Sequence, residues 1–146
     1  MSATARLAER ALAAAGAEPP GYLRSLTLCN VAAAAGHKGG TERLLGALRD
    51  ELGSGPGAEA FLAAAALHCR TQDDFYPEGR VHVGAITLAA TLALADEAGD
   101  RLLECLAAGY EVMCAVSAAY APAAQAAGLR PSGVFGPLGA AASASV

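Results

Sequence analysis

The sequence predicts an all-α protein, a compact bundle of about six to seven helices that forms one domain over residues 1–146. Alanine and leucine dominate a composition that is 54% hydrophobic, and glycine recurs where apparent helices end. No segment alternates polar and apolar residues for long enough to predict a strand. A chain of this length buries a core without a metal or disulfides, so one domain is expected.

The first half of the chain predicts four helices, each with apolar residues at helical spacing and each ending at a glycine or a turn. Thr41 is the expected N-cap of the third. The fourth has no polar face, so we expect it in the middle of the bundle. The four helices are expected at residues 3–15, 22–35, 41–52 and 58–70, with a surface loop at 37–40 and Leu44, Leu45 and Leu48 as the buried face of the third.

The second half predicts a fifth helix over residues 82–98, in which only Thr87 and Thr91 interrupt the apolar surface, so this helix is also expected to be central. Gly99 should end it, and Asp100 should cap the next helix. That sixth helix is expected over residues 101–119, with an irregular extension to 127 and a kink at Pro122. A loop at 128–137 should precede a last helix at 138–145, whose Gly/Ala/Ser surface we expect a partner chain to cover.

Charge and patterning exclude several functional classes. The net charge is −4 without a basic cluster, which argues against nucleic acid. The run from Cys105 to Ala124 is interrupted by Glu111 and Pro122, so no membrane span is expected. No signal peptide is visible, and the four cysteines lack metal or redox spacing, which predicts buried reduced thiols in a cytoplasmic protein.

One polar stretch, residues 68–82, interrupts the apolar helices, and we expect any chemistry there. It holds two of the three histidines, His68 and His82, and the pair Asp73-Asp74. A polar loop between two apolar helices brings its side chains together where the helices meet. At the start of a helix, His82 should favour neutral imidazole, which acts as a base or a hydrogen-bond donor.

The same residues carry a family resemblance. The order is His68 with Asp73-Asp74, then His82-Val-Gly-Ala before an alanine/leucine-rich helix, then Gly109-Tyr-Glu-Val. This order resembles the MmgE/PrpD family of 2-methylcitrate dehydratases and cis-aconitate decarboxylases. The resemblance implies a helical domain and a lyase that needs no metal or other cofactor. It also implies that the family's active-site lysines and lid domain lie beyond Val146.

Two departures from the family pattern fall at its active site. Thr71 stands where the family has an active-site aspartate, and Arg130, before Pro131-Ser132, stands where it has a second histidine. Of the family's active-site histidines, only one is matched, by His82. Arginine suits a carboxylate or enolate through paired hydrogen bonds but is a poor base at neutral pH.

We expect His82 to act as acid or base, with Asp74 and Arg130 orienting the substrate. Further substrate contacts are expected from His68, Asp73, Tyr76, Arg80 and Ser132. Each has a structural alternative: His68 can be a structural hydrogen-bonder, the aspartates can cap a turn, Arg130 can be solvated, and the turn accounts for Tyr76 and Arg80. His68, Cys69, Asp73 and His82 lack zinc spacing, so no metal is expected. Glu111, on an apolar helix, should have a structural partner.

Three functions fit the sequence. The first is a subunit of a split lyase, a dehydratase or decarboxylase of a small carboxylate, completed by a chain that supplies the rest of the family fold. The second is a homodimer or other homo-oligomer that isomerises or cyclises an apolar biosynthetic intermediate. The third is a non-catalytic partner of a full-length relative.

Overall fold

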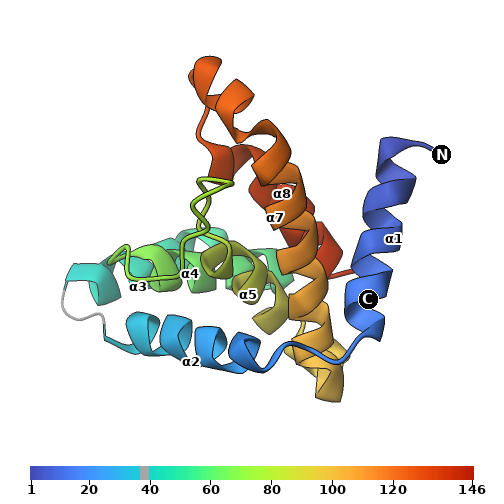
Figure 1. Cartoon of the computed structure of the whole chain (residues 1–146). Helices are drawn as coiled ribbons and strands as arrows, with labels where there is room; N and C mark the ends of the chain where they lie inside the picture. The colour runs from blue at the N-terminus through green and yellow to red at the C-terminus, as the bar shows by residue number, and fades with distance from the viewer. Residues whose placement is uncertain (37–39) are drawn as a thin grey trace.

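The computed structural model describes residues 1–36 and 40–146, in which all regular elements are helices apart from one isolated bridge. The all-α prediction is confirmed. Most of the predicted loop at 37–40 lies outside the described residues. Three helices stand side by side, and four others run across one end of this group (Figure 1). The upright helices are α1 (Ala3–Gly16), α7 (Leu102–Ala126) and α8 (Pro131–Ser143), and the crossing helices are α2 (Gly21–Ala35), α3 (Gly40–Leu52), α4 (Pro56–His68) and α5 (Gly84–Leu92).

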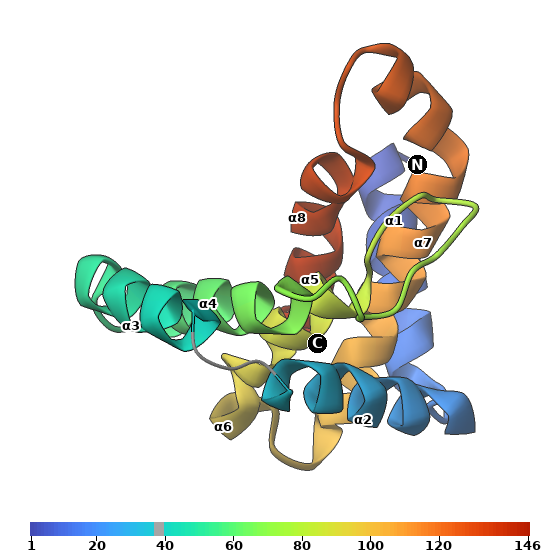
Figure 2. The same ribbon diagram turned by 90° about the vertical axis from the view of Figure 1, so that its left-hand side faces the viewer.

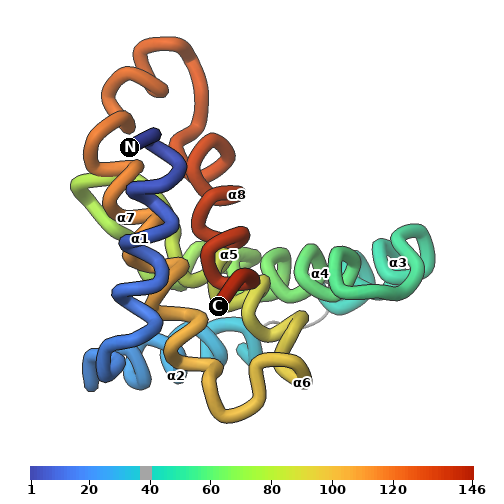
Figure 3. Tube along the Cα trace, turned by 90° about the vertical axis from the view of Figure 1, so that its right-hand side faces the viewer, coloured from blue at the N-terminus to red at the C-terminus, as the bar shows by residue number. Residues whose placement is uncertain are grey.

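The core is built around α5 and α7, as their apolar sequences predict. Leu88 of α5 and Leu106 of α7 are almost fully buried in a cluster that also takes side chains from α2 and α4. Further along α7, Met113 packs with Phe135 of α8, and Val112 packs with Ala11 of α1. Figure 3 shows α1 and α8 beside α7.

The helices α3 and α4 extend away from the upright group (Figure 2), which corrects two predictions. Helix α4 is not in the middle of the bundle, because Phe61 is 51% exposed while only Leu62 and Leu67 are buried. Leu44 of α3 is 59% exposed, so it is not part of a buried face. The apolar composition of α4, which has no polar face, did not ensure its burial, because neighbouring helices cover only one side of α3 and α4.

Several helix ends also differ from the prediction. Helix α3 begins at Gly40, so Thr41 is not its N-cap. The single helix predicted at 82–98 forms two helices in the structure. Helix α5 stops at Leu92, and a short α6 (Ala95–Ala98) follows, although no proline or glycine marks the break. Asp100 lies in the 3₁₀ turn η1 (Gly99–Arg101), and the N-cap residue of α7 is Arg101 instead.

The last helix is longer than predicted, because α8 forms over much of the loop expected at 128–137. Pro131 is its first residue, a position where the missing N–H makes no difference. Pro137 lies inside α8, and packing against α7 and α5 maintains the helix there. Phe135 and Ala142 are buried by these neighbours, whereas Val134 and Leu138 remain partly exposed.

The stretch Ala95–Ala126 is long and apolar enough to cross a membrane by length and composition, contrary to expectation. This is weak support for a membrane span, because the core helix of a soluble protein passes the same test and 44% of the apolar window is buried here.

Pro122 lies inside α7, and Glu111 has its expected partner, since Arg10 of α1 donates to it from Nε at 2.8 Å. Cys29 and Cys69 are exposed, so the prediction of buried cysteines is wrong for these two.

Candidate active site

The segment between α4 and α5 forms a folded loop held against α7. Tyr76 and Val81 pair through two backbone hydrogen bonds of 2.9 and 3.3 Å, and Val81 is fully buried. Gly79 lies so close to α7 that a Cβ atom there would be 2.0 Å from the Ser117 hydroxyl. This close contact with α7 and the Tyr76–Val81 bridge hold the loop in one position, with the histidines and aspartates toward its two ends.

At these ends, one buried carboxylate lies between two imidazoles. The Asp73 side chain is fully buried, and its Oδ1 lies 2.9 Å from His68 Nδ1. Its Oδ2 lies 3.2 Å from His82 Nδ1. The two imidazole rings meet edge to face, with centroids 4.6 Å apart, and the Phe75 ring centroid lies 5.0 Å from that of His82. His68, Asp73 and His82 are called the His–Asp–His cluster below.

The two halves of the cluster are not equivalent. His68 makes a hydrogen bond to Asp73, whereas Asp73 Oδ2 and His82 Nδ1 are buried and have no hydrogen-bond partner in the described residues, despite their separation. A carboxylate oxygen is an acceptor, and a ring nitrogen beside it is compatible only if it carries a proton or shares a cation. The described residues that form ion pairs with Asp73 are these two histidines.

His82 also lines a cavity of about 390 Å³ with three other residues of the predicted site. The Ser132 hydroxyl accepts a hydrogen bond from the His82 backbone N–H at 3.1 Å, which joins α8 to the loop. Arg130 lies at the start of α8, and Arg80 lies at the tip of the loop, where its side chain donates to Gln125. This cavity combines an imidazole with two guanidinium groups, which suits an anionic ligand.

Asp74 faces a different network. Its Oδ1 accepts hydrogen bonds from Asn30 Nδ2 and from the Gly84 backbone N–H, both at 2.9 Å. Its Oδ2 accepts one from the Tyr110 hydroxyl at 2.9 Å, and the Asp74 N–H donates to Asn30 Oδ1 at 3.0 Å. Burial, followed by the charge of Asp74, raises the pKa of Tyr110 far above its usual value, so its hydroxyl remains a donor. This network ties α2, α5 and α7 to the loop.

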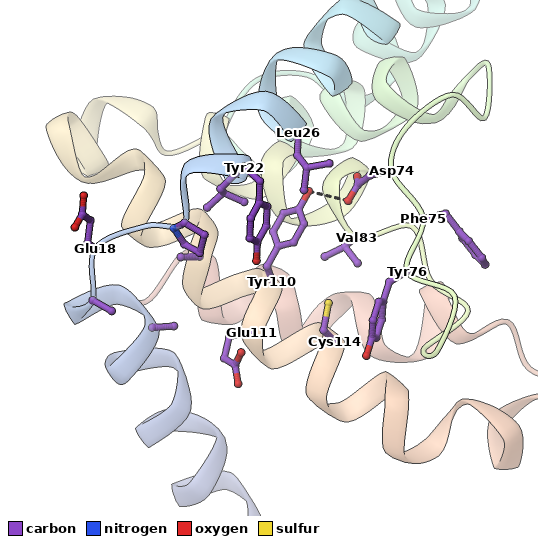
Figure 4. A pocket seen from close by; sticks show the side chains of 15 residues that line it. Glu18, Tyr22, Leu26, Asp74, Phe75, Tyr76, Val83, Tyr110, Glu111 and Cys114 are labelled. Carbon is purple, nitrogen blue, oxygen red and sulfur yellow. Dashed lines mark hydrogen bonds between the residues drawn. The ribbon is translucent and has the colours of Figure 1, made fainter.

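Asp74 and Tyr76 line a second, mostly apolar pocket of about 520 Å³ beside α1, α2 and α7 (Figure 4). Tyr110 and Cys114 of α7 lie along it. Burial, together with the nearby carboxylates Asp74 and Glu111, raises the pKa of the Cys114 thiol to about 11. Phe75 lines both this pocket and the His82 cavity, so the loop separates the two.

The predicted site residues are thus divided. His82 meets Asp73 and His68 directly and shares its cavity with Arg80, Arg130 and Ser132. Asp74 and Tyr76 line the apolar pocket instead. In the part of the chain that the structure describes, the His–Asp–His cluster is also the group able to hold a metal, with ligand atoms within 4.8 Å of one another.

Sequence reasoning missed Asn30 and Tyr110 as partners of the loop. Asn30 is 1% exposed, and its amide both donates to and accepts from Asp74. A single amide within an otherwise apolar stretch of α2 was the available signal. Tyr110 belongs to the Gly-Tyr-Glu-Val stretch, but nothing local showed that its hydroxyl reaches Asp74.

Comparison with known proteins identifies the domain. No curated protein and no solved structure matches the chain. The family description "MmgE/PrpD N-terminal domain" matches residues 11–146, which include all eight predicted site residues. The chain therefore belongs to the MmgE/PrpD family.

Proposed function

We propose that this domain is the helical subunit of an MmgE/PrpD-like lyase, which removes a proton next to a carboxylate with loss of water or carbon dioxide. The observation that carries the proposal is the position of His82, which is backed by Asp73 and opens onto a cavity that also holds Arg80 and Arg130. A base beside cationic groups is what abstraction of a proton next to a carboxylate requires.

In this proposal Asp73 sets the tautomer of His82. With the proton on Nδ1, facing Asp73 Oδ2 at 3.2 Å, the other ring nitrogen, Nε2, has a free lone pair. Nε2 takes the proton from the substrate carbon, and the electron pair left behind forms a carbon–carbon double bond as the neighbouring C–O bond breaks. The proton on Nε2 passes to the departing hydroxyl, which leaves as water. In the decarboxylation variant, loss of carbon dioxide supplies the electron pair, and protonated Nε2 returns a proton to the carbon.

Arg130 is the residue proposed to bind the substrate carboxylate. It is exposed at the start of α8, and the described residues include no hydrogen bond or ion pair to its side chain, so the guanidinium is available. Arg80 is already bonded to Gln125 and would contribute charge at the cavity wall. Both Asp74 oxygens already accept protein hydrogen bonds, so Asp74 is proposed to orient the loop rather than the substrate.

A separate chain is proposed to complete the site. The matched family region is described as an N-terminal domain. Around the His82 cavity, Phe75 is 51% and Leu129 53% exposed. Apolar rims of this kind favour coverage by another surface.

Localisation is proposed to be cytoplasmic.

The apolar pocket favours a second candidate function. Its walls are chiefly alanine, leucine and tyrosine side chains, with few charges, which suits an apolar intermediate better than a tricarboxylate. A homo-oligomer that isomerises or cyclises such a molecule is therefore the alternative. A non-catalytic partner of a full-length relative is the third.

The test begins with co-expression of the chain and its genomic neighbours, followed by pull-down and mass spectrometry. A stoichiometric partner that matches the rest of the family fold is the expected result. The complex is then incubated with small di- and tricarboxylates in D₂O, and deuterium incorporation is followed by NMR. A chain that elutes alone as a stable oligomer refutes the split lyase and directs screening to apolar intermediates.

Variants then separate the roles. His82→Gln should lower the exchange rate by about 10²- to 10⁴-fold, the usual range for loss of an acid–base group. Arg130→Gln should raise KM by about 10- to 100-fold, because it removes a charge-assisted contact. Arg43→Gln is the matched control, because Arg43 is an exposed arginine of α3, outside the cavity. Unchanged activity in His82→Gln would favour the non-catalytic partner.

A further inference from the structure

We propose that the His–Asp–His cluster binds a divalent transition-metal ion, with Zn²⁺ as the best match, and that the metal occupies the place of the proton between Asp73 and His82. The metal-binding part stands on geometry alone. Its consequence for catalysis rests on the proposed function, because a metal on His82 would remove the tautomer that leaves Nε2 as base.

The donor set is the first argument. Two imidazole nitrogens and one carboxylate oxygen are a common three-ligand set for Zn²⁺, and a fourth position stays open for water. One ligand atom from each residue lies within 4.8 Å of the other two. Cys69 follows His68 in sequence, but its thiol donates to the Ala66 carbonyl at 3.1 Å, so it is not a member of the set.

The unpartnered atoms are the second argument. Asp73 Oδ2 and His82 Nδ1 are both buried and both lack a hydrogen bond in the described residues, yet they lie 3.2 Å apart. A buried carboxylate without a compensating charge is costly. A cation between these atoms satisfies both at once and balances the charge of Asp73.

The distances require a small adjustment that the structure permits. Zn–N and Zn–O bonds of about 2.0–2.2 Å place tetrahedral ligand atoms about 3.3 Å apart. The separation of 3.2 Å between His82 Nδ1 and Asp73 Oδ2 is close to this value, whereas His68 Nδ1 lies 2.9 Å from the other carboxylate oxygen, Oδ1, and must turn toward the ion. The widest separation must shorten by at most about 1.5 Å. The His68 side chain, 44% exposed at the end of α4, has room to turn and gives the ion a path from solvent.

The experiment measures metal binding directly on the isolated chain, without substrate or partner. The background is Cys29→Ser/Cys69→Ser, because both thiols are exposed and would bind metal on their own. Zn²⁺ affinity is measured by competition with a chromophoric chelator. Co²⁺ serves as a spectroscopic probe, whose visible bands report low coordination number. One ion per chain, with cobalt bands of a four- or five-coordinate site, is expected.

The ligand variants are His68→Gln and Asp73→Asn, each checked for folding by thermal melting. Each should weaken Zn²⁺ binding by more than about 100-fold, since loss of a residue that only holds a metal ligand in place already costs about 10- to 100-fold. The matched control is Asp50→Asn, which changes an exposed carboxylate of α3 outside the cluster and should retain the wild-type affinity. His68→Gln changes a partly exposed side chain, so it should fold even if Asp73→Asn does not.

Two results would overturn the proposal: no stoichiometric Zn²⁺ binding by the background chain, or binding that His68→Gln leaves unchanged. Neither depends on any enzymatic activity. Conversely, a complex that stays inactive after its metal has been removed, while its helical chain still binds added Zn²⁺, would contradict the lyase proposal and leave the metal site intact.

Discussion

Gly84→Ala is the substitution that most directly tests the network holding the loop. Gly84 is the first residue of α5, and a Cβ atom there would lie 2.1 Å from Asn30 Nδ2, 2.2 Å from Asp74 Oδ1 and 2.8 Å from the Tyr110 hydroxyl. The first two distances are far shorter than any van der Waals contact. The third is also below 3.0 Å, so the Asn30 amide, the Asp74 carboxylate and the Tyr110 hydroxyl must all shift, and the bonds from Asn30 and Tyr110 to Asp74 are lost.

The expected cost follows from the bonds that are lost. Asp74 accepts three hydrogen bonds here, and two of them come from the side chains that must move. Hydrogen bonds to charged groups contribute about 1.5–3 kcal/mol each, and alanine recovers up to about 1 kcal/mol of backbone entropy. The net loss should be about 3 kcal/mol, which lowers Tm by about 6–12 °C in a domain of this size.

The assay is thermal and urea unfolding followed by circular dichroism, with Gly46→Ala as the matched control. Gly46 lies in the middle of α3 with open space around its Cα, so alanine there should stabilise the protein by up to about 1 kcal/mol. Tyr110→Phe provides a second check, because its cost should be smaller in the Gly84→Ala background than in the wild type. A Gly84→Ala protein that melts within about 1 °C of wild type would refute the reasoning.

Three further predictions concern α7. At pH 8, Cys114 should react with iodoacetamide about 100-fold more slowly than a thiol with the ordinary pKa of 9.0, because the pKa of Cys114 is raised to about 11. Site-resolved mass spectrometry measures the two alkylation rates. A rate at Cys114 equal to that of the exposed Cys29 would contradict the prediction. Since the raised pKa belongs to the folded state, the stabilising contribution of Cys114 is complete below pH 9 and is lost as pH rises through about 11, so Cys114→Ala should reduce the alkaline loss of stability. Gly109→Ala should lower the free energy of unfolding by about 1–3 kcal/mol, measured by urea unfolding. The new Cβ atom would lie 1.9 Å from the Ser143 hydroxyl and 3.0 Å from the Gly139 carbonyl, both in α8. A variant as stable as the wild type would show that α8 can shift without cost.

Much of the local structure was determined by the sequence alone. Helices α1 and α2 were predicted to within one residue at each end, because apolar spacing and flanking turn residues are local signals. The polar stretch 68–82 was also identifiable, since its composition contrasts with the helices on either side. The start of α8 was not predicted, because the helix begins at Pro131, inside the expected loop at 128–137.

The tertiary structure alone decided how the site residues are used. Asp73 and Asp74 are neighbours in sequence, yet Asp73 lies between two histidines and Asp74 bonds to Asn30 and Tyr110, which are 44 and 36 residues away. Exposure of α4 and the break after Leu92 were decided in the same way. Helix formation depends on neighbours within one or two turns, whereas burial and hydrogen-bond partners depend on which distant segments pack together, and the sequence of one chain does not specify this locally.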